Sequence, residues 1–454
     1  MNAHLARQFF RLGSSIAFRT TGRAYTADDV IGSAIKLAAR MPDEGYAINL
    51  CEDRLQFAIG FVAAVMKGHV LLLPQNRKPA TLASLSRSYP GCYCLVDQGA
   101  PDYPEFTCLE SAVLQQVGPL KTNLPMLADD QLCALVFTSG STGLPQANRK
   151  YWKTLVQGTS LNEDYLWSAV ASAPSILATV PPQHMYGLET TILAPLFLPV
   201  TAISRTAFFP ADIVAALEAM PRPRVLVSTP IHLRALMATG LALPPVDLVL
   251  CATAPLDPGL AREIERACGG VLREVYGCTE AGSFAWREPV RESRWELFRE
   301  FNLTIDPGET RLLADHLPEP VRLQDTIVMD NGGKFRLLGR LDDLVNIAGK
   351  RASLADLNLK LLSIPGVQDG IITHASQPKS TEIERLIGLV VTDLDPSTLH
   401  RELEKLVDSV FIPRPLLRVE HIPRGPAGKI DRASIDRLLS QARHATKPCR
   451  GLDA

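Results

Sequence analysis

Residues 132–146 read LCALVFTSGSTGLPQ, an apolar strand that runs directly into a loop of glycine and hydroxyl side chains. Small residues let a backbone approach a phosphate, and amide N–H groups and hydroxyls supply donors to its oxygens. The loop is not a P-loop, which ends in Gly-Lys-Ser/Thr, because Leu144 and Pro145 follow its last glycine. A flexible Ser/Gly linker is the competing interpretation, and the strand before the loop disfavours it. The stretch predicts a phosphate-binding loop made of Thr138, Ser139, Gly140, Ser141, Thr142 and Gly143.

On both sides of this stretch, short apolar strands alternate with amphipathic helices. The patterns predict three strands, each followed by a helix, at 46–50 and 54–66, 225–228 and 231–240, and 246–251 and 259–268. Such alternation favours an α/β fold, with a large N-terminal domain of α/β subdomains built around sheets rich in parallel strands. Ligands in such folds bind beyond the carboxyl ends of the strands.

The pattern changes near residue 340. The remaining segments predict a helix, two strands, a helix and a strand at 353–362, 370–373, 386–391, 397–410 and 416–421. They indicate a small α+β C-terminal domain. We therefore expect domains at 1–340 and 344–441, a hinge at 341–343 and a frayed tail at 442–454.

The composition is that of an ordinary folded protein. Of 454 residues, 46% are hydrophobic and 21% are charged, and the net charge is -1. A balanced charge argues against nucleic acid or an anionic membrane surface as a partner, and favours small molecules or one specific protein. The 9 cysteines are odd in number and scattered, which fits a reduced cytoplasm. Every apolar run is interrupted before about 18 residues, so we expect no membrane span.

The phosphate loop resembles that of the adenylate-forming superfamily, which includes acyl-CoA and aryl-CoA ligases, peptide-synthetase adenylation domains and luciferases. Further motifs match in order over nearly the whole chain. The resemblance implies that ATP and Mg²⁺ activate a carboxylic acid as an acyl-AMP, whose acyl group then passes to a thiol. It also identifies CATAPL at 251–256 as the adenine-side loop, with Ala254 beside the nucleotide.

The segment VYGCTE at 275–280 resembles the family's Tyr-Gly-x-Thr-Glu element. By this resemblance Tyr276 packs on adenine, Thr279 contacts the α-phosphate, and Glu280 helps to hold Mg²⁺. A hard cation prefers carboxylate oxygens and bridges phosphates, so the chemistry is consistent. Without the motif, Tyr276 would be taken as a core aromatic and Glu280 as a solvated charge.

Asp325 and Arg340 lie fifteen residues apart, on two strand-like segments joined by a turn at 331–333. In the family an aspartate and an arginine at this interval bind the ribose hydroxyls. Without the resemblance they would be a turn residue and a surface charge.

Residues 339–351, GRLDDLVNIAGKR, resemble the crossover between the large and small domains of acyl-CoA synthetases. Asp342 takes the hinge position, and Gly349 takes a position that lets the pantetheine thiol approach the acyl-adenylate. Near the end, PRGPAGKIDR at 423–432 matches the family's terminal Gly-Lys loop. Its Lys429 would bridge the substrate carboxylate and the α-phosphate, so we expect Lys429, Arg340 and Thr279 to be the catalytic residues.

Two positions depart from the family pattern. Gln146 stands where the phosphate loop usually ends in lysine, and Arg149 or Lys150 is a conjectural substitute for that charge. Glu274 replaces a common asparagine near adenine and could still accept from the exocyclic amine.

The segment PPQHMYG at 181–187 lies where the family places one wall of the acyl pocket, and His184, Met185 and Gly277 are the candidate substrate contacts. Amino-acid-activating relatives place an aspartate there, and a buried ammonium without one would be costly, so an amino acid is disfavoured. The segment resembles the 4-hydroxybenzoate-activating ligases of aryl polyene and xanthomonadin-type pathways, which load an acyl carrier protein. His184 could also be a gate beside the thiol tunnel or a packed core histidine.

The sequence therefore predicts an ATP-dependent aryl-acid ligase whose acceptor is the phosphopantetheine thiol of an acyl carrier protein or of CoA. Two alternatives stay open: a ligase for medium-chain or hydroxylated fatty acids, and a non-catalytic nucleotide-binding relative, which the missing lysine at Gln146 motivates.

Overall fold

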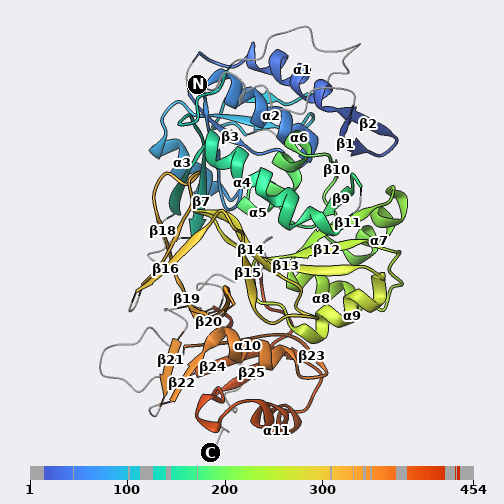
Figure 1. The fold of residues 1–454 in the computed structure, drawn as a ribbon, viewed down its shortest axis with the longest axis vertical. Helices are drawn as coiled ribbons and strands as arrows, with labels where there is room; N and C mark the ends of the chain where they lie inside the picture. Colours follow the sequence, from blue (N-terminus) through green and yellow to red (C-terminus); the bar gives the residue numbers. More distant parts are fainter. Residues whose placement is uncertain are drawn as a thin grey trace, which may run out of the picture.

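The computed structural model arranges the chain as three stacked parts, from the N-terminal sheet through a large central sheet to a small C-terminal unit (Figure 1). It describes residues 15–43, 45–100, 103–112, 126–139, 145–170, 172–306, 309–330, 332–340, 344–347, 350–374 and 386–424, and also 435 and 437–439. The fold is of the α/β class with parallel-rich sheets, as predicted.

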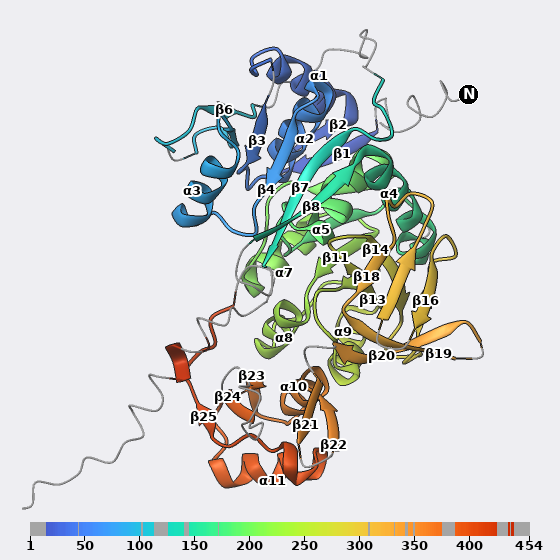
Figure 2. The same cartoon turned by 90° about the vertical axis from the view of Figure 1, so that its left-hand side faces the viewer.

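The N-terminal sheet has 6 strands in the described residues, in the order β6-β5-β3-β4-β7-β8. All neighbours are parallel except β7 and β8, which form an antiparallel hairpin. That hairpin reaches out of the sheet toward the middle of the molecule (Figure 2). The strands are β3 (Tyr46–Asn49), β4 (Val70–Leu73), β5 (Tyr93–Val96), β6 (Cys108–Glu110), β7 (Leu132–Ser139) and β8 (Pro145–Tyr151).

The central sheet has 11 strands in the described residues, in the order β19-β20-β15-β14-β13-β12-β11-β9-β10-β1-β2. Its middle, from β1 to β13, is parallel, and both edges are antiparallel. The strands are β1 (Ile16–Thr20), β2 (Arg23–Thr26), β9 (Ser175–Ala178), β10 (Thr201–Ile203), β11 (Arg224–Ser228), β12 (Leu248–Cys251), β13 (Val271–Cys278), β14 (Gly282–Arg287), β15 (Trp295–Leu297), β19 (Asp325–Met329) and β20 (Lys334–Arg340).

Helices cover the two large sheets. Their apolar residues form separate buried clusters on the two sides of the central sheet. The helices are α1 (Ala27–Ala38), α2 (Arg54–Lys67), α3 (Pro79–Ser88), α4 (Trp152–Tyr165), α5 (Met185–Leu188), α6 (Ala194–Phe197), α7 (Pro210–Ala219), α8 (Pro230–Ala238) and α9 (Pro258–Cys268), with a 3-10 turn η2 (Trp167–Ala169) and a π-helix η3 (Glu189–Leu193). The three strand-helix pairs predicted from sequence are confirmed within a few residues.

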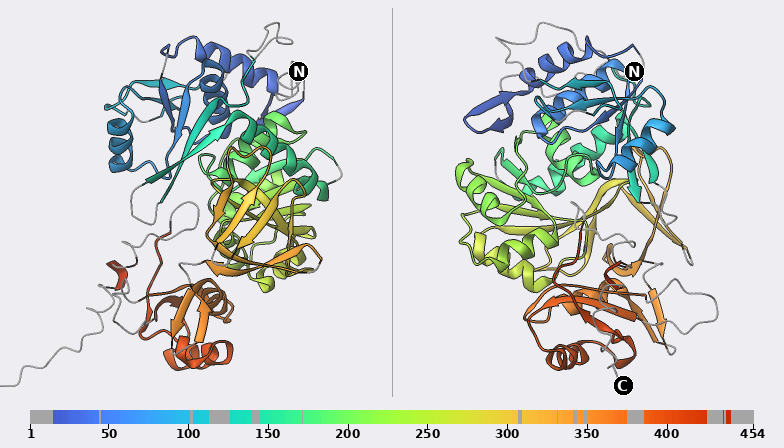
Figure 3. Two further views of the ribbon diagram at one scale, coloured as in Figure 1. Left: turned by 60° about the vertical axis from the view of Figure 1, so that its left-hand side comes forward. Right: turned by 180° about the vertical axis from the view of Figure 1, so that it is seen from behind.

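Beside the central sheet lies a three-stranded antiparallel sheet of β16 (Asn302–Asp306), β17 (Glu309–Leu313) and β18 (Val321–Leu323). The C-terminal unit has its own apolar core around α10 and α11, and lies below the other parts (Figure 3). It contains β21 (Leu344–Ile347), β22 (Lys350–Ser353), α10 (Leu354–Leu362), β23 (Val367–His374), β24 (Leu386–Thr392), α11 (Pro396–Leu406), the 3-10 turn η5 (Ser409–Phe411) and β25 (Leu416–Arg418).

Two elements of this unit are shorter than predicted from the sequence. The helix expected to reach residue 410 ends at Leu406, because the Asp408 carboxylate accepts from the amide of Val410 and starts a new turn. The last strand ends at Arg418 rather than near residue 421. Arg234 of α8 donates to the carbonyl of Leu362 at the end of α10, 3.0 Å away, and so joins the unit to the central part.

A buried arginine joins the N-terminal and central sheets. Arg54, at the start of α2, has no exposed surface. One of its guanidinium nitrogens donates to the carbonyls of Ala178 and Val180, at 3.0 and 2.7 Å, and the other donates to the Thr206 hydroxyl at 2.8 Å. Burial lowers the pKa of Arg54 to about 10. The cation fixes the end of β9, directly before the predicted acyl wall.

Among the described residues, no helix combines the length and apolar character that crossing a bilayer requires.

Candidate active site

Three of the predicted site segments leave the central sheet at the same edge. Residues 181–187 follow β9, residues 252–256 follow β12, and residues 276–280 end β13 and continue beyond it. β9, β11, β12 and β13 are parallel neighbours. Because the carboxyl ends of parallel strands meet at one edge, the fold brings these segments together where α/β proteins bind ligands.

Tyr276 and Asp325 contact one another across this edge. The Tyr276 hydroxyl donates to Asp325 Oδ2 at 2.9 Å, and its ring packs against aromatic side chains with ring centroids 4.7 Å from Phe284 and 5.4 Å from Trp295. Asp325 also pairs in register with Arg340 across the β19–β20 hairpin. The interval of fifteen residues therefore places the backbones of Asp325 and Arg340 opposite each other, and Tyr276 contacts the Asp325 side chain.

The residues after Tyr276 form a tight, largely exposed turn. Strand β13 bulges between Tyr276 and Gly277, and a Cβ at Gly277 would lie 2.5 Å from the carbonyl oxygen of Gly282. Only glycine fits there. Beyond it, Thr279 is half-buried and Glu280 is exposed, so both can meet a bound ligand. On the adenine side, Ala254 is exposed as well.

The predicted acyl wall is tightly packed. A Cβ at Gly187 would lie 2.1 Å from the carbonyl oxygen of Pro181, so the segment folds back on itself at a glycine. Met185 is buried and His184 is half-buried at the start of α5. The Tyr186 hydroxyl is buried without a hydrogen-bond partner among the described residues, and burial raises its pKa.

Glu274 does not act as a free acceptor for adenine. It is 2% exposed and accepts from Nε of Arg287 at 2.7 Å and from the amide of Leu256 at 3.0 Å. Burial raises the pKa of its carboxyl, and Arg287 opposes that rise. Glu274 instead holds the loop that carries Ala254 against β13, which corrects the role considered from sequence.

Lys150 cannot replace the missing lysine at Gln146. It is 0% exposed, and its ammonium donates to the carbonyl of Glu280 at 2.7 Å. In the β7–β8 hairpin Gln146 pairs with Thr138 at the tip, whereas Lys150 pairs with Ala134, four residues further back. At about 3.4 Å per residue this is on the order of 14 Å. Arg149 is exposed on the opposite face of β8 and stays a candidate.

Sequence reasoning missed a buried carboxylate behind this turn. Glu189, 2% exposed in the π-helix η3, accepts from the Ser283 hydroxyl at 2.8 Å and from its amide at 3.2 Å. Burial raises the pKa of the Glu189 carboxyl to about 7. A sequence signal did exist, because Glu189 is the single charge in the apolar run 185–198.

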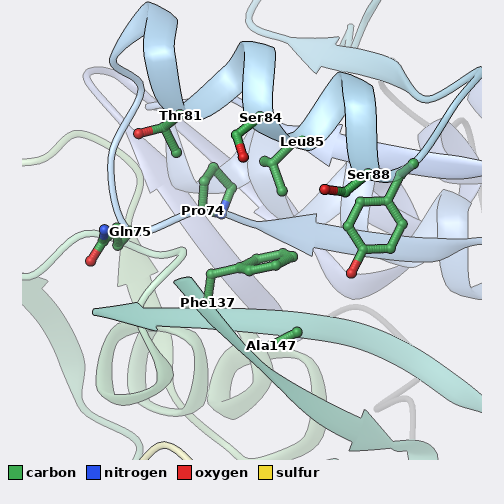
Figure 4. A pocket seen from close by; sticks show the side chains of 9 residues that line it. Pro74, Gln75, Thr81, Ser84, Leu85, Ser88, Phe137 and Ala147 are labelled. Carbon is green, nitrogen blue, oxygen red and sulfur yellow. The ribbon is translucent and has the colours of Figure 1, made fainter. Parts of the chain in front are cut away.

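A cavity of about 270 Å³ lies between α3 and the β7–β8 hairpin. Hydroxyl groups of α3 line one wall and the Phe137 ring lies across from them (Figure 4). Among the residues that the structure describes, no charged side chain lines it. The lining residues are Pro74, Gln75, Thr81, Ser84, Leu85, Ser88, Tyr89, Phe137 and Ala147.

Several predicted residues lie outside the described residues. They are Gly140, Ser141, Thr142 and Gly143 of the phosphate loop, Asp342 of the hinge, Gly349, and Lys429. Of the loop's neighbours, Thr138 is described, and its hydroxyl accepts from the Asn148 amide at 3.3 Å. Ser139 ends β7, and Arg340 ends β20.

No three histidine, cysteine, aspartate or glutamate side chains gather into a metal cage within the described ranges. Magnesium in nucleotide sites takes one or two carboxylates and completes its shell with phosphate oxygens and water. A single exposed carboxylate at Glu280 fits that pattern.

Known proteins are similar to the chain over most of its length. It is 28% identical to a 4-coumarate–CoA ligase of Halorhodospira halophila over 64% of this chain and 73% of that protein. It is 21% identical to a 3,4-dihydroxybenzoate–[aryl-carrier protein] ligase of Bacillus anthracis over 66% of this chain and 73% of that protein.

The fold also matches a solved structure of o-succinylbenzoate coenzyme A synthetase from Bacillus subtilis in complex with ATP and a magnesium ion. The TM-score is 0.76 at 15% identity, over 93% of this chain and 97% of that one. A family described as "AMP-binding enzyme" matches residues 46–312, more than half of the chain. The chain belongs to this AMP-binding enzyme family and is an adenylate-forming acid–thiol ligase.

Proposed function

We propose that the protein activates an aromatic carboxylic acid of the 4-hydroxybenzoate type with ATP and loads it on a phosphopantetheine thiol. The observation that carries the proposal is the wall at residues 181–187, which contains no acidic side chain and presents a buried Met185 beside His184. An ammonium group on the substrate would have no partner there, whereas an uncharged aromatic ring needs none. Two of the similar proteins described above are named for aryl acids.

The first step joins the acid to AMP. A carboxylate oxygen attacks the α-phosphorus of ATP, and the bond to diphosphate breaks as diphosphate leaves with its electron pair. Tyr276 and Asp325 would hold adenine and ribose, and Thr279 would donate to the α-phosphate. Mg²⁺, when bound, would supply positive charge that offsets the charge of the phosphates. Glu280 is the residue that would hold it.

The second step moves the acyl group. The thiol sulfur attacks the acyl carbon, the bond to the AMP oxygen breaks, and the thiol proton passes to solvent. We propose that residues 344–441 rotate about a hinge at 341–343, with Asp342 at its centre, so that Lys429 serves the first step and Gly349 the second. The separate apolar core of the C-terminal unit supports this proposal.

The decisive experiment is exchange of labelled pyrophosphate into ATP with 4-hydroxybenzoate, benzoate, cinnamates and fatty acids assayed side by side. We expect the fastest exchange with 4-hydroxybenzoate. Faster exchange with a medium-chain or hydroxylated fatty acid would reassign the substrate. Nucleotide binding without exchange for any acid would favour a non-catalytic relative. In Lys429→Ala, exchange should fall about 100- to 1000-fold, because one preorganised cation is lost.

The acceptor needs a separate assay. Thioester formation is measured with CoA and with a phosphopantetheinylated carrier protein at equal thiol concentration. We expect the carrier protein to be the better acceptor, and a preference for CoA would reverse that assignment. Asp342→Pro should leave either exchange or thioester formation intact but not both, and equal retention of both would argue against rotation.

A further inference from the structure

The turn at residues 279–281 carries Thr279 and Glu280, and two buried ionisable groups hold it from behind. One is the Lys150 ammonium on β8, which belongs to the N-terminal sheet. The other is the Glu189 carboxylate in η3, which follows directly on the helix that carries Met185. Neither group is needed for the chemistry proposed above.

Lys150 reaches the turn across the boundary between two sheets. It is 0% exposed, and its Nζ lies 2.7 Å from the carbonyl oxygen of Glu280. Taking an ammonium out of water is costly unless it finds a hydrogen-bond partner. Once the hairpin is folded, the contact with the Glu280 carbonyl is therefore strongly favoured over an unpaired ammonium. Because the carbonyl and the side chain of Glu280 belong to one residue, fixing the peptide restricts where the carboxylate can point.

Glu189 holds the other end of the same turn. Its carboxylate accepts from both the amide and the hydroxyl of Ser283, at 3.2 and 2.8 Å. Gly282 makes room for it, because a Cβ at that position would lie 2.1 Å from Glu189 Oε1. A π-helical turn, as in η3, is a rare local geometry that is frequent at functional sites.

We propose that Lys150 and Glu189 are positioning residues for the metal contact of the turn, Lys150 by holding the peptide of Glu280 and Glu189 by holding Ser283. The inference rests on the proposed role of Glu280 in binding Mg²⁺. If the turn loses one anchor, only a fraction of molecules presents Glu280 correctly, and the apparent affinity for Mg²⁺ falls by that fraction.

The test measures how nucleotide binding depends on Mg²⁺. Binding of a non-hydrolysable ATP analogue is followed by calorimetry over a series of Mg²⁺ concentrations, for the full-length wild type and for Lys150→Met. We expect the Mg²⁺ concentration at half-maximal effect to rise about tenfold, the size of a lost hydrogen bond to a charged group. Binding of the analogue without Mg²⁺ should be unchanged. Lys150→Arg, which keeps a cationic donor, should recover most of the loss.

Lys153→Met is the matched control. Lys153 lies three residues further along the chain, and its ammonium also donates to a main-chain carbonyl, that of Asp315 at 2.8 Å. It does not contact the turn. We expect Lys153→Met to bind the analogue with the Mg²⁺ dependence of the wild type, and the same shift in both variants would overturn the inference.

Lys150→Met removes a buried charge and can fail to fold, so two milder variants test the other anchor. Ser283→Ala removes one donor to Glu189, and Glu189→Gln keeps the shape of the side chain. Both should shift the Mg²⁺ dependence in the same direction by about two- to fivefold. An unchanged Mg²⁺ dependence in these two variants sinks the inference whatever Lys150→Met does.

The outcomes separate this inference from the proposed function. If the wild type binds the analogue in a Mg²⁺-dependent way but exchanges pyrophosphate with no acid, the function is wrong and the calorimetry still decides the inference. If the wild type exchanges normally and Lys150→Met matches Lys153→Met, the inference alone is wrong.

Discussion

The turn between β13 and β14 has an exposed side and a buried side, and the two are built differently. The exposed side presents a half-buried Thr279 and an exposed Glu280. The buried side consists of Lys150 and Glu189, each 2% exposed or less and each hydrogen-bonded to the turn. Groups that meet a ligand must stay accessible, whereas groups that hold them in place are stabilised by burial with a partner.

This contrast separates two kinds of variant. Changes on the buried side should lower the free energy of unfolding, because a buried polar group left without its partner costs about 1–3 kcal/mol. Changes on the exposed side should leave unfolding nearly unchanged and act on nucleotide binding and turnover. The following four predictions test whether stability effects and binding effects separate in this way.

The largest effect is expected for Gly282→Ala. Gly282 has φ +80°, and an added Cβ would lie 2.1 Å from Glu189 Oε1. Left-handed backbone and overpacking together should lower the free energy of unfolding by about 2–5 kcal/mol, measured by urea denaturation. Gly68→Ala is the control, since Gly68 has φ +81° with open space around it. It should lose about 1–2 kcal/mol, and equal losses would mean that the carboxylate is not packed there.

Glu189 should make stability depend on pH. Its folded pKa of about 7 lies above the ordinary value of 4.5, so its contribution is full below pH 4.5 and is lost as the pH rises through 7. The loss amounts to about 3 kcal/mol. Relative to wild type, Glu189→Gln should therefore gain stability as the pH rises over this window, measured by urea denaturation at each pH. Glu105 is exposed, so Glu105→Gln should show no such gain. The same pH dependence of stability in both variants would show that the Glu189 carboxyl is not buried.

Asp325→Ala should act on binding instead. Losing a charged acceptor for the ribose hydroxyls is expected to weaken binding by about 1.5–3 kcal/mol, which raises the KM for ATP about 10- to 100-fold. The free energy of unfolding should change by less than about 1 kcal/mol. Steady-state exchange and urea denaturation check the two statements. Asp212→Ala, on the exposed first turn of α7, is the control and should change neither quantity.

The smallest effect is expected for Tyr276→Phe. The ring keeps its contacts with Phe284 and Trp295, and only the hydroxyl that donates to Asp325 is lost. Removing one such bond costs about 1 kcal/mol, so the KM for ATP should rise about fivefold. Tyr165→Phe removes a similar donor to Glu300, 3.0 Å away, outside the site. Equal KM values for the two variants would show that the Tyr276 hydroxyl does not orient Asp325.

Local patterns predicted the exposed side of the site well. The strand-helix alternation placed residues 252–256 and 276–280 after strands, and the two strand-like segments that carry Asp325 and Arg340 are the paired strands β19 and β20. These features depend on short stretches of chain, in which the spacing of apolar residues and the turn residues determine where strands and turns form. The placement of these residues follows from such local order, while their catalytic roles stay predictions.

The buried side was not predictable in the same way. A lysine on a strand is ordinarily solvated, and Lys150 is buried only through tertiary packing, in which α4 packs against both β8 and β14. Glu274 shows the same limit, since its partner Arg287 lies on the next strand and its contact with Leu256 spans eighteen residues. Such pairs arise from tertiary packing, for which a single sequence carries no local signal.

The order of the strands in the sheets could not be predicted from the sequence either. Strands β1 and β2 belong to the central sheet through β10, nearly two hundred residues later in the chain. Hydrophobic periodicity identifies strands but not their neighbours, because pairing is decided by long-range contacts.

The forked contact of Arg54 with the carbonyls of Ala178 and Val180 has a consequence for engineering substrate scope. The segment proposed as the acyl wall begins directly after Val180, so a transplanted segment must leave those two carbonyls where they are. Lysine cannot take over at position 54, since an ammonium on a flexible stem lacks the planar fork that reaches the Thr206 hydroxyl as well. Chimeras joined at Pro181 should therefore fold, whereas those joined upstream of Ala178 would need the donor's own arginine.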